Sequence, residues 1–497
     1  MGLKMLLKGN CIRVFEFTRF STCRFICSGR SNDAEFSVSN VRTVQNFNDI
    51  PIARRLPIIG TKMDFLLTGF GTRFHEYIDN RHRTLGSIFR EPVGGGTEVI
   101  FINSPDMMRE MFVYEGKYPK HPLPDAWTLY NEIHNCKRGL FFMDDEEWSA
   151  NRKIMNTMLL RNDFKLAHRV IENVSDDLIT DWNRNTENVG KCMQVTELMA
   201  VLYTWAIKVL VFTMIGDTHG TEVDKINQLL PKFSGIVQDI FERTAPLMVV
   251  PPSFAQKYNL NIWSEFEKSV TSTLEIANEI VEVGLKMNGN GLLKEMQSNS
   301  MSTETIKRIF VDLIIAAGDT TAYTTQWALF LLSSNNSEQS KIRAQLNSSN
   351  FETPLIRGTV KESLRLFPVA TFIGRILPGD GIIGNYRIPQ HTAVIASMYS
   401  IGRDAKNFPN PNEFQPSRWL RDSSGNMQCV HRTNMPYAMG IRSCVGQKLA
   451  NSMMHILLSK ILANFEVKLL NKSPVGVVMR LIAVPTQPIL LGIKRLS

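Results

Sequence analysis

One short segment near the carboxyl end constrains this chain more than any other. Residues 437–446 read Tyr-Ala-Met-Gly-Ile-Arg-Ser-Cys-Val-Gly, and an apolar pattern with helical spacing follows over residues 447–457. The segment predicts a loop that places Cys444 at the start of a helix, where the positive end of the helix dipole stabilises a thiolate. Gly440 lets the backbone approach a flat partner closely, and Arg442 can meet an anionic group on that partner.

A lone cysteine is more often a small buried side chain than a ligand, so the surrounding pattern decides its role. The segment resembles the heme-binding signature of the cytochrome P-450 family, Phe-x-x-Gly-x-Arg-x-Cys-x-Gly, with Tyr437 where phenylalanine is usual. The resemblance implies heme b, with Cys444 as axial ligand of its iron and Tyr437, Gly440 and Arg442 at the cofactor. It also implies a monooxygenase, because thiolate ligation favours cleavage of the O–O bond.

The fold that this resemblance implies is mainly α with small β sheets, with heme between a long distal helix and the proximal cysteine loop. The apolar spacing agrees, since it is helical through most of the chain, and β-like stretches are confined to residues 98–102, 381–388 and 477–493. We expect one domain over residues 34–497, with the polar segments 288–305 and 333–350 as surface loops. Residues 246–252 are apolar and interrupted by prolines, which allows either interior packing or contact with a membrane surface.

A pair of charged residues follows the family pattern upstream of the loop. Glu362 and Arg365 are three residues apart, so they share one face of a helix. Such a pair alone usually belongs to a solvated face. Arg418 stands in a Phe-Gln-Pro-Ser-Arg-Trp segment that resembles the family segment whose arginine completes a Glu-Arg-Arg network. The resemblance therefore predicts that these three side chains meet beneath the heme loop.

Three further residues resemble the family's contacts to the heme propionates. Trp148 and Arg152 lie one helical turn apart in Trp-Ser-Ala-Asn-Arg, and Arg375 stands where the family places another propionate-binding arginine. A tryptophan and an arginine with this spacing would mean little elsewhere. The resemblance predicts that all three bind the cofactor.

The segment from Phe310 to Thr321 resembles the long helix that crosses the distal face of the heme. Ala316, Ala317 and Gly318 are expected to leave room for oxygen, although the glycine stands one position later than usual. An acid next to an alcohol is unfavourable in the middle of an apolar helix, because both side chains compete for backbone hydrogen bonds. We therefore expect Asp319 and Thr320 to be catalytic, delivering protons through a hydroxyl or water relay.

The amino-terminal segment decides which branch of the family the chain resembles. Residues 1–32 contain six basic residues and one acidic residue, and so carry five of the nine net positive charges. A charge interrupts the segment every four to six positions, which excludes an ordinary membrane anchor. Its arginines and serines predict a mitochondrial transit peptide over residues 1–33, the alternative being a basic tail without special meaning. No nucleic-acid partner is expected, because the folded part is only mildly basic.

The mitochondrial branch takes electrons from a small acidic ferredoxin, which an NADPH-dependent reductase supplies. Arg357 and Lys361, one helical turn apart and just before Glu362, match the basic pair that this branch presents to ferredoxin. Two basic residues with this spacing are otherwise a solvated face. The resemblance also implies peripheral contact with the inner mitochondrial membrane on its matrix side.

Within this branch, three runs are similar to the arthropod ecdysteroid 2-hydroxylases: residues 118–130, 138–143 and 307–317. That similarity implies a steroid substrate, with hydroxylation of 2-deoxyecdysone to ecdysone. The residues themselves indicate only an apolar pocket. Three alternatives remain: another mitochondrial steroid or xenobiotic hydroxylase, a heme-thiolate isomerase that needs no oxygen, and a heme sensor without turnover.

Overall fold

The structure is a computed structural model that describes most of the chain after the amino-terminal segment. The described residues are 43–54, 61, 64, 68, 71–94, 97–161, 165–189, 192–216, 221–287, 289–346, 352–421 and 433–496. The expected transit peptide and its boundary at residues 33 and 34 lie outside these residues.

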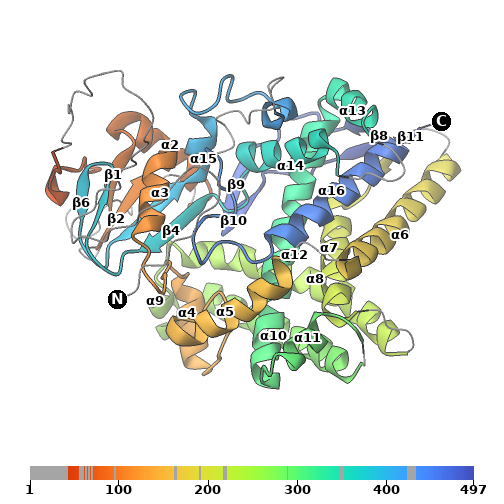
Figure 1. Ribbon diagram of the computed structural model, residues 1–497, viewed down its shortest axis with the longest axis horizontal. Coiled ribbons are helices and arrows are strands. Elements are labelled where there is room, and N and C mark those ends of the chain that lie inside the picture. Colours follow the sequence, from red (N-terminus) through yellow and green to blue (C-terminus); the bar gives the residue numbers. More distant parts are fainter. Residues whose placement is uncertain are drawn as a thin grey trace, which may run out of the picture. The chain divides into compact units, whose positions relative to one another are not determined.

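Helices make up most of the described chain, as Figure 1 shows. The first group comprises α2 (Phe74–Leu85), α3 (Pro105–Val113), α4 (Asp125–Ile133), α5 (Asp145–Leu159), α6 (Lys165–Val189), α7 (Leu198–Ile215), α8 (Thr221–Leu247) and α9 (Pro252–Lys257). The second comprises α10 (Asn261–Lys286), α11 (Leu292–Ser298), α12 (Thr303–Ser333), α13 (Asn336–Arg343), α14 (Pro354–Leu366), α15 (Met398–Arg403) and α16 (Gln447–Asn464). Two short 3-10 helices, η1 (Phe47–Asp49) and η2 (Pro416–Trp419), complete the set.

The helix α12 is the central element of the helical part (Figure 1). It begins at a capped end, where the Ser302 side chain accepts a hydrogen bond from the backbone N–H of Thr305. It packs along α7, which is apolar on all sides and contributes largely buried side chains. By length and composition α7 could span a membrane, but two thirds of it is buried within the protein, as in a core helix.

The strands form small sheets beside the helices (Figure 1). A four-stranded sheet has the order β1-β2-β7-β4, in which only β2 and β7 are parallel. The others are β3-β11-β8, β9-β10 and the hairpin β5-β6. The bounds are β1 (Ile88–Gly94), β2 (Thr97–Ile102), β3 (Met193–Val195), β4 (Phe372–Ile376), β5 (Gly381–Ile383), β6 (Tyr386–Ile388), β7 (Ala393–Ser397), β8 (Phe465–Leu469), β9 (Val477–Arg480), β10 (Ile482–Pro485) and β11 (Leu491–Arg495).

The expected fold class, mainly α with small β sheets, is confirmed. All three expected β stretches contain strands. The two polar segments expected to be surface loops instead contain α11 and α13, because a few apolar residues suffice to anchor a short helix: Leu292, Leu293 and Met296 in α11, and Ile342 in α13 are buried. Sequence patterns detect such helices poorly, since most of their residues are polar.

The proline-interrupted segment 246–252 is partly buried and partly exposed. Leu247 and Pro252 are buried, whereas Met248 between them is 62% exposed. The helix α8 ends and α9 begins within this segment. Beyond it, Phe254 and Tyr258 are exposed on α9 and its end, with ring centroids 4.7 Å apart. The α8–α9 junction therefore packs inward through Leu247 and Pro252, and it exposes the apolar side chains of Met248, Phe254 and Tyr258.

Candidate active site

The loop around Cys444 is closed by its own backbone. The Cys444 N–H donates to the carbonyl oxygen of Tyr437 at 2.9 Å, and Gly440 adopts the left-handed conformation with φ of +79°. Gly446 is the N-cap of α16. Burial raises the pKa of the Cys444 thiol, whereas backbone hydrogen bonds at Gly446 and Gln447 and the charge of Arg152 lower it. The local structure thus supplies thiolate stabilisation against an unfavourable interior.

The surroundings of Cys444 are partly open and apolar. Its side chain is accessible to solvent although protein atoms surround it closely. Three large apolar side chains from the loop and from the segment before α5 are also open, namely Met439 at 41%, Ile441 at 50% and Phe141 at 49%. Exposed apolar side chains of this size favour contact with an apolar partner. A thiol within such surroundings fits a flat, apolar group.

Arginines and a tryptophan gather beside the loop. Arg442 donates to the carbonyl oxygens of Pro119 and Met143, both at 2.7 Å, and its guanidinium carbon lies 5.0 Å from the Trp148 ring centroid. Arg152, one turn after Trp148 on α5, donates to the carbonyl oxygen of Ser443 in the loop. The Trp148 indole N–H is buried and has no partner among the described residues.

Arg375, on β4, reaches the same loop through a carboxylate. It donates to Glu115 at 2.7 Å, and the other Glu115 oxygen accepts the Ile441 N–H at 3.1 Å. A side chain at Gly440 would collide with this carboxylate, since its Cβ would lie 1.9 Å from Oε1. Gly440 is therefore required for the approach of Glu115 to the loop. One nitrogen of Arg375, Nη2, is buried without a partner in the described part of the chain.

His121 belongs to this group, although no sequence motif singles it out. Its ring lies 4.5 Å from that of Phe141, and its Nε2 is buried without a partner among the described side chains. Burial and the nearby charges of Arg442 and Arg375 lower the pKa of His121 from 6.5 to about 3. A neutral histidine near two arginines offers a hydrogen-bond donor without adding charge.

These groups fit the heme that the sequence resemblance implies. Buried polar atoms are almost always hydrogen-bonded, so unpartnered nitrogens on Trp148, Arg375 and His121 within one cluster indicate a missing acceptor. The propionates of heme are anionic acceptors, and the surrounding arginines favour such charges. The apolar side chains around Cys444 suit the porphyrin ring. Donor set, charge and shape are all consistent with heme.

The middle of α12 has one open face. Ala316 is exposed, and Ala317 and Thr320 are half-buried, although their neighbours on other faces are buried. The Thr320 hydroxyl donates to the carbonyl oxygen of Ala316 at 2.9 Å. Gly318 does not contribute to this face: a Cβ there would lie 2.5 Å from Cδ1 of Ile207 on α7. The expectation that Gly318 leaves room for oxygen is therefore wrong, since it permits close packing of α7.

Asp319 also lies away from the open face. It is 1% exposed, and its Oδ2 has no hydrogen-bond partner in the described part of the chain. Burial raises the pKa of Asp319 well above its ordinary value, because a charged carboxylate is unfavourable away from water. No direct hydrogen bond between Asp319 and Thr320 is found among the described residues. The two neighbouring side chains thus face different surroundings.

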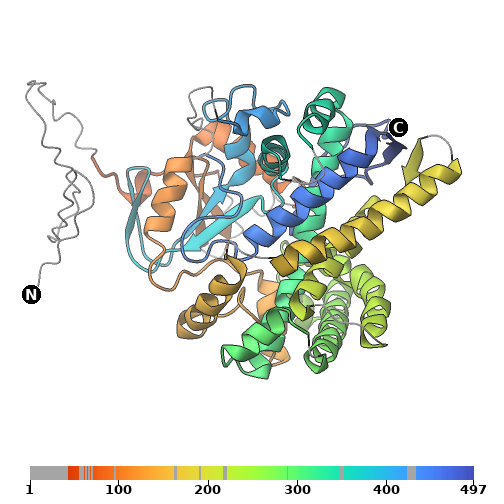
Figure 2. The same ribbon diagram turned by 45° about the vertical axis from the view of Figure 1, so that its right-hand side comes forward.

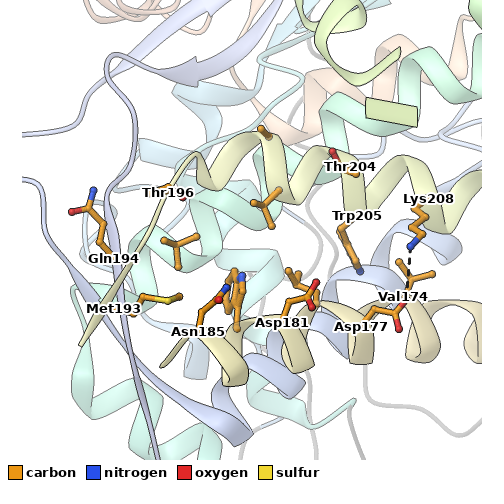
Figure 3. Close-up of a pocket in the computed structure, with 15 residues that line it drawn as sticks. Val174, Asp177, Asp181, Asn185, Met193, Gln194, Thr196, Thr204, Trp205 and Lys208 are labelled. Carbon is orange, nitrogen blue, oxygen red and sulfur yellow. Dashed lines mark ion pairs between the residues drawn. The ribbon is translucent and has the colours of Figure 1, made fainter. Parts of the chain in front are cut away.

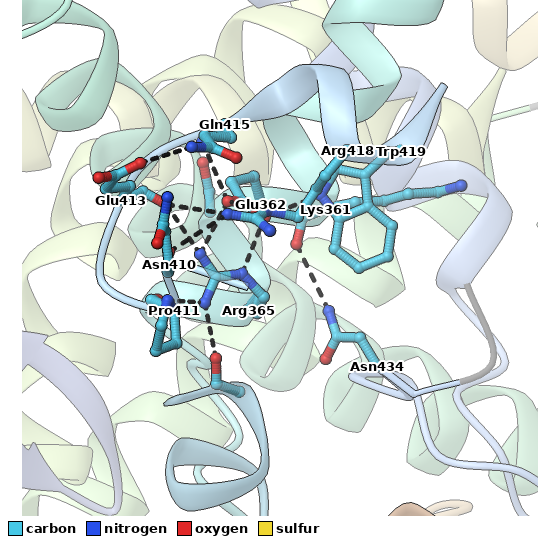
Figure 4. Close-up of polar contacts among 12 residues, drawn as sticks. Lys361, Glu362, Arg365, Asn410, Pro411, Glu413, Gln415, Arg418, Trp419 and Asn434 are labelled. Carbon is cyan, nitrogen blue, oxygen red and sulfur yellow. Dashed lines mark hydrogen bonds and ion pairs between the residues drawn. The ribbon is translucent and has the colours of Figure 1, made fainter. Parts of the chain in front are cut away.

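Glu362, Arg365 and Arg418 meet in a buried network (Figure 4). Arg365 donates to both Glu362 oxygens, at 2.9 and 2.7 Å, and Arg418 donates to Oε1 at 2.8 Å. The Trp419 indole N–H donates to Oε2 at 2.9 Å, and the Gln415 N–H donates to Oε1 at 3.0 Å. Arg365 also bonds the carbonyl oxygens of Gly402 and Glu413. The network joins α14 to η2 and the preceding loop.

Arg357 and Lys361 occupy the exposed side of α14. Arg357 pairs with Glu352 at 3.1 Å and keeps 55% of its side chain exposed. The Lys361 Nζ lies 5.8 Å from the Trp419 ring centroid, and partial burial and the charge of Arg357 lower its pKa. The two residues therefore present positive charge from the helix that also carries Glu362.

Comparisons with known proteins agree with this site. Residues 50–493 match the family described as Cytochrome P450. The chain is a cytochrome P450. It is 39% identical over 90% of its length to "Cytochrome P450 315a1, mitochondrial" from Drosophila melanogaster, of which 88% is covered. It is 29% identical to "Cholesterol side-chain cleavage enzyme, mitochondrial" from Oncorhynchus mykiss, with 93% of each chain covered, and 25% identical to "Cytochrome P450 11B, mitochondrial" from Aquarana catesbeiana, with 84% of each covered.

Membership of the family makes the protein a heme-binding monooxygenase with relatives among steroid-metabolising enzymes. A P450 incorporates oxygen from O₂ into its substrate at the heme. The protein supplies cofactor binding, substrate orientation and protons.

One hollow in the P450 surface is separate from the residues selected from the sequence. It lies between α6, α7 and β3, with a volume of about 490 Å³, and none of those residues lines it (Figure 3). Lys208 and Asp177 face each other across it at 3.7 Å. It therefore plays no part in the site described above.

Proposed function

We propose that this P450 is a mitochondrial ecdysteroid 2-hydroxylase that converts 2-deoxyecdysone to ecdysone. The three runs similar to that group supply the substrate assignment. The steroid-metabolising relatives support a substrate of this size and apolar character.

The observation that carries this proposal is that the three runs form one structural unit. Arg138, in the second run, donates to Asp312 of the third at 2.8 and 2.6 Å, and the Gly139 N–H donates to the other Asp312 oxygen at 2.6 Å. Trp127, in the first run, lies 5.0 Å from the Arg138 guanidinium. Residues that resemble one enzyme group in three separate runs therefore contact one another.

This Arg138–Asp312 clasp holds the segment before α5 against α12. Both side chains are buried, at 4% and 8% exposure, and buried charges persist only when they are paired. Arg308 strengthens the contact by donating to the Arg138 carbonyl oxygen at 2.9 Å. Phe142 also packs against Arg138, with its ring 4.8 Å from the guanidinium and stacked beside Trp127. The clasp thus sets the position of residues 138–143 relative to the distal helix, where substrate is expected to bind.

Product analysis tests the substrate assignment. The heme-loaded enzyme, with a ferredoxin and its reductase, would be given 2-deoxyecdysone, other ecdysteroid precursors and cholesterol under labelled O₂. We expect one labelled oxygen at carbon 2 of 2-deoxyecdysone. Oxidation at another carbon, or preference for the cholesterol side chain, would identify a different steroid hydroxylase.

A conservative pair of variants tests the part that the clasp plays in specificity. Arg138→Lys keeps the charge but cannot form the same forked contact with Asp312, so KM for the preferred steroid should rise about tenfold. Arg243→Lys changes an exposed pair with Glu265 and should leave KM unchanged. Equal KM values in both variants would remove the clasp from substrate recognition.

The remaining site residues have proposed roles that follow from their positions. Cys444 is the iron ligand, and Trp148, Arg152, Arg375, Arg442 and His121 hold the propionate side of the heme. Thr320, on the open face of α12, would hand on protons during oxygen activation, with Asp319 as the acid behind it. The Glu362 network fixes the segment that precedes the cysteine loop.

Arg357 and Lys361 are proposed to dock an acidic ferredoxin. Attraction between opposite charges raises the encounter rate and weakens with salt. Reversing both residues to glutamate should slow ferredoxin-supported turnover at low salt by about tenfold or more. Turnover driven by an artificial oxidant needs no docking and serves as control. Full ferredoxin-supported activity with unchanged salt dependence would reject this surface.

Location in the mitochondrion, at the matrix side of the inner membrane, completes the proposal. The relatives reported above are named mitochondrial. Met248, Phe254 and Tyr258 form an exposed apolar tip around the α8–α9 junction, and Lys257 lies beside Tyr258. Aromatic side chains with a neighbouring lysine suit the boundary between lipid headgroups and acyl chains. We expect this tip to contact the membrane surface.

A further inference from the structure

Asp319 is buried in an unusual setting for a carboxyl group. It has no cation as partner among the described residues, and its Oδ2 receives no hydrogen bond there. A buried polar atom that lacks a partner costs free energy, so native structures usually supply one, often an ordered water. The surroundings of Asp319 show which groups could share that water.

Tyr203, on α7, is the first of these groups. It is 0% exposed, and its hydroxyl also lacks a partner in the described part of the chain. The ring lies directly against α12 at Gly318, because a Cβ there would be 3.0 Å from the Tyr203 hydroxyl oxygen. Burial and the neighbouring Asp319 both raise the pKa of Tyr203, so the phenol remains a proton donor. Two unpartnered polar groups therefore lie next to each other between α7 and α12.

Tyr323 is the second group, and it leads toward solvent. It follows Asp319 by four residues on α12, so the two side chains share one face of the helix. Tyr323 is half-buried, and its pKa is raised by burial and by Asp319, while Arg480 lowers it. Beyond it, Arg480 of β9 pairs with Glu242 of α8 at 3.3 Å, with both side chains largely exposed. The titratable and charged groups that face this cluster are thus the Asp319 carboxyl inside and the Glu242–Arg480 pair outside.

We propose that Tyr203 and Asp319 hold a buried water between α7 and α12, and that Tyr323 connects this water to solvent at Glu242 and Arg480. The arrangement offers the water polar partners in an otherwise apolar contact, which is what an ordered internal water requires. Tyr203 and Tyr323 are positioning residues that act through Asp319. This inference rests on the proposed proton relay, to which it adds the path by which protons arrive.

The proton balance of this path is simple. When Asp319 gives its proton toward Thr320, the buried water gives one to Asp319, and Tyr323 passes a replacement inward while taking one from solvent. No group keeps a net charge after a full cycle, which suits an interior where an isolated carboxylate is unfavourable. This arrangement also explains why the glycine of the motif stands one position later than usual. Without a side chain at Gly318, Tyr203 can reach the position beside Asp319.

The water site is tested by infrared spectroscopy of the heme-loaded protein. The band of a protonated carboxyl that disappears in Asp319→Asn belongs to Asp319. Tyr203→Phe removes the phenol that orders the water, so this band should shift to higher frequency. Tyr386→Phe, on β6, is the matched control and should leave the band in place. An unshifted band in Tyr203→Phe overturns the water site.

Proton delivery is tested by turnover with ferredoxin. Tyr203→Phe and Tyr323→Phe should each lower product per electron pair by about threefold, as the loss of one ordinary hydrogen bond predicts, and should raise the solvent deuterium isotope effect. If both variants give the same product per electron pair and the same isotope effect as Tyr386→Phe, the proposed path from the surface is wrong. Thr320→Ala separates the two hypotheses: unchanged coupling in that variant rejects the proposed relay, while a band shift in Tyr203→Phe still supports the buried water.

Discussion

Two buried arginine clusters in this protein differ in whether the chain itself completes them. Both carboxylate oxygens of Glu362 accept hydrogen bonds from Arg365 or Arg418. These two arginines also donate to backbone carbonyl oxygens. Beside the cysteine loop, by contrast, Arg375 and Trp148 each keep a buried nitrogen without a partner in the described part of the chain.

The difference separates a network made for folding from one made for a ligand. Buried polar groups cost free energy unless they are paired, so a cluster with every partner present can form as the chain folds. A cluster with donors left over gains its full stabilisation only when an acceptor arrives. Variants of the two clusters should therefore affect different quantities.

Replacing Cys444 by serine should have the largest effect, and only on the second cluster. A neutral hydroxyl is a far weaker iron ligand than a thiolate, so we expect loss of the thiolate spectrum of the reduced CO complex and no measurable turnover. Cys136→Ser and Cys192→Ser are controls and should retain the spectrum. A normal band position in Cys444→Ser would reject Cys444 as the ligand. The stability of the heme-free chain should hardly change.

Glu362→Gln should act on the first cluster instead. It leaves Arg365 and Arg418 buried without a countercharge, which costs about 3–5 kcal/mol in the free energy of unfolding. Denaturant unfolding of the heme-free protein measures this loss. Glu265→Gln, in an exposed pair with Arg243, should cost at most about 1 kcal/mol. Equal losses in both variants would mean that the Glu362 network contributes little to folding.

Thr320→Ala probes the open face of α12 without disturbing the packing. We expect heme and substrate to bind normally, while product per electron pair falls about tenfold as hydrogen peroxide is released, because general acid catalysis is lost. Ser334→Ala removes a similar hydroxyl-to-carbonyl hydrogen bond at the exposed end of α12 and serves as the control. An unchanged ratio of product to electrons would remove Thr320 from the relay.

Two tryptophans give the smallest but most direct contrast. Trp148→Phe removes an indole N–H that has no partner within the described chain, so heme should dissociate about fivefold faster while heme-free stability changes little. Trp419→Phe removes an N–H that donates to Glu362, so it should lower heme-free stability by about 1–3 kcal/mol. Heme transfer to apomyoglobin and denaturant unfolding measure the two effects. Lower heme-free stability in Trp148→Phe together with faster heme loss in Trp419→Phe would contradict the distinction between the clusters.

The sequence predicted the parts of the site that short motifs define. Glu362 and Arg418 are far apart in the chain, yet the motif around each was enough to expect their contact. The cysteine loop and the start of α16 follow from a local run of glycines and apolar residues. These features depend on neighbouring residues, which a sequence displays directly.

Features that depend on packing between distant elements were missed. Nothing around His121 or Tyr203 distinguishes them from other buried aromatic residues until α7 and the arginine cluster are in place. Gly318 was assigned to the wrong face for the same reason, since its neighbour Ile207 lies on another helix. The strands β1, β4 and β7 also escaped notice, because their short runs lack a clear alternation of polar and apolar residues.

The clasp between Arg138 and Asp312 has a consequence for building hybrid enzymes. Its two residues lie in runs separated by seven helices, α5 to α11, yet within the described chain each buries a charge that the other neutralises. A crossover that exchanges residues 118–143 with another family member, without residues 307–317, would leave one of these charges unmatched in the interior. Libraries recombined with both segments inherited together should therefore yield more folded members than libraries that separate them.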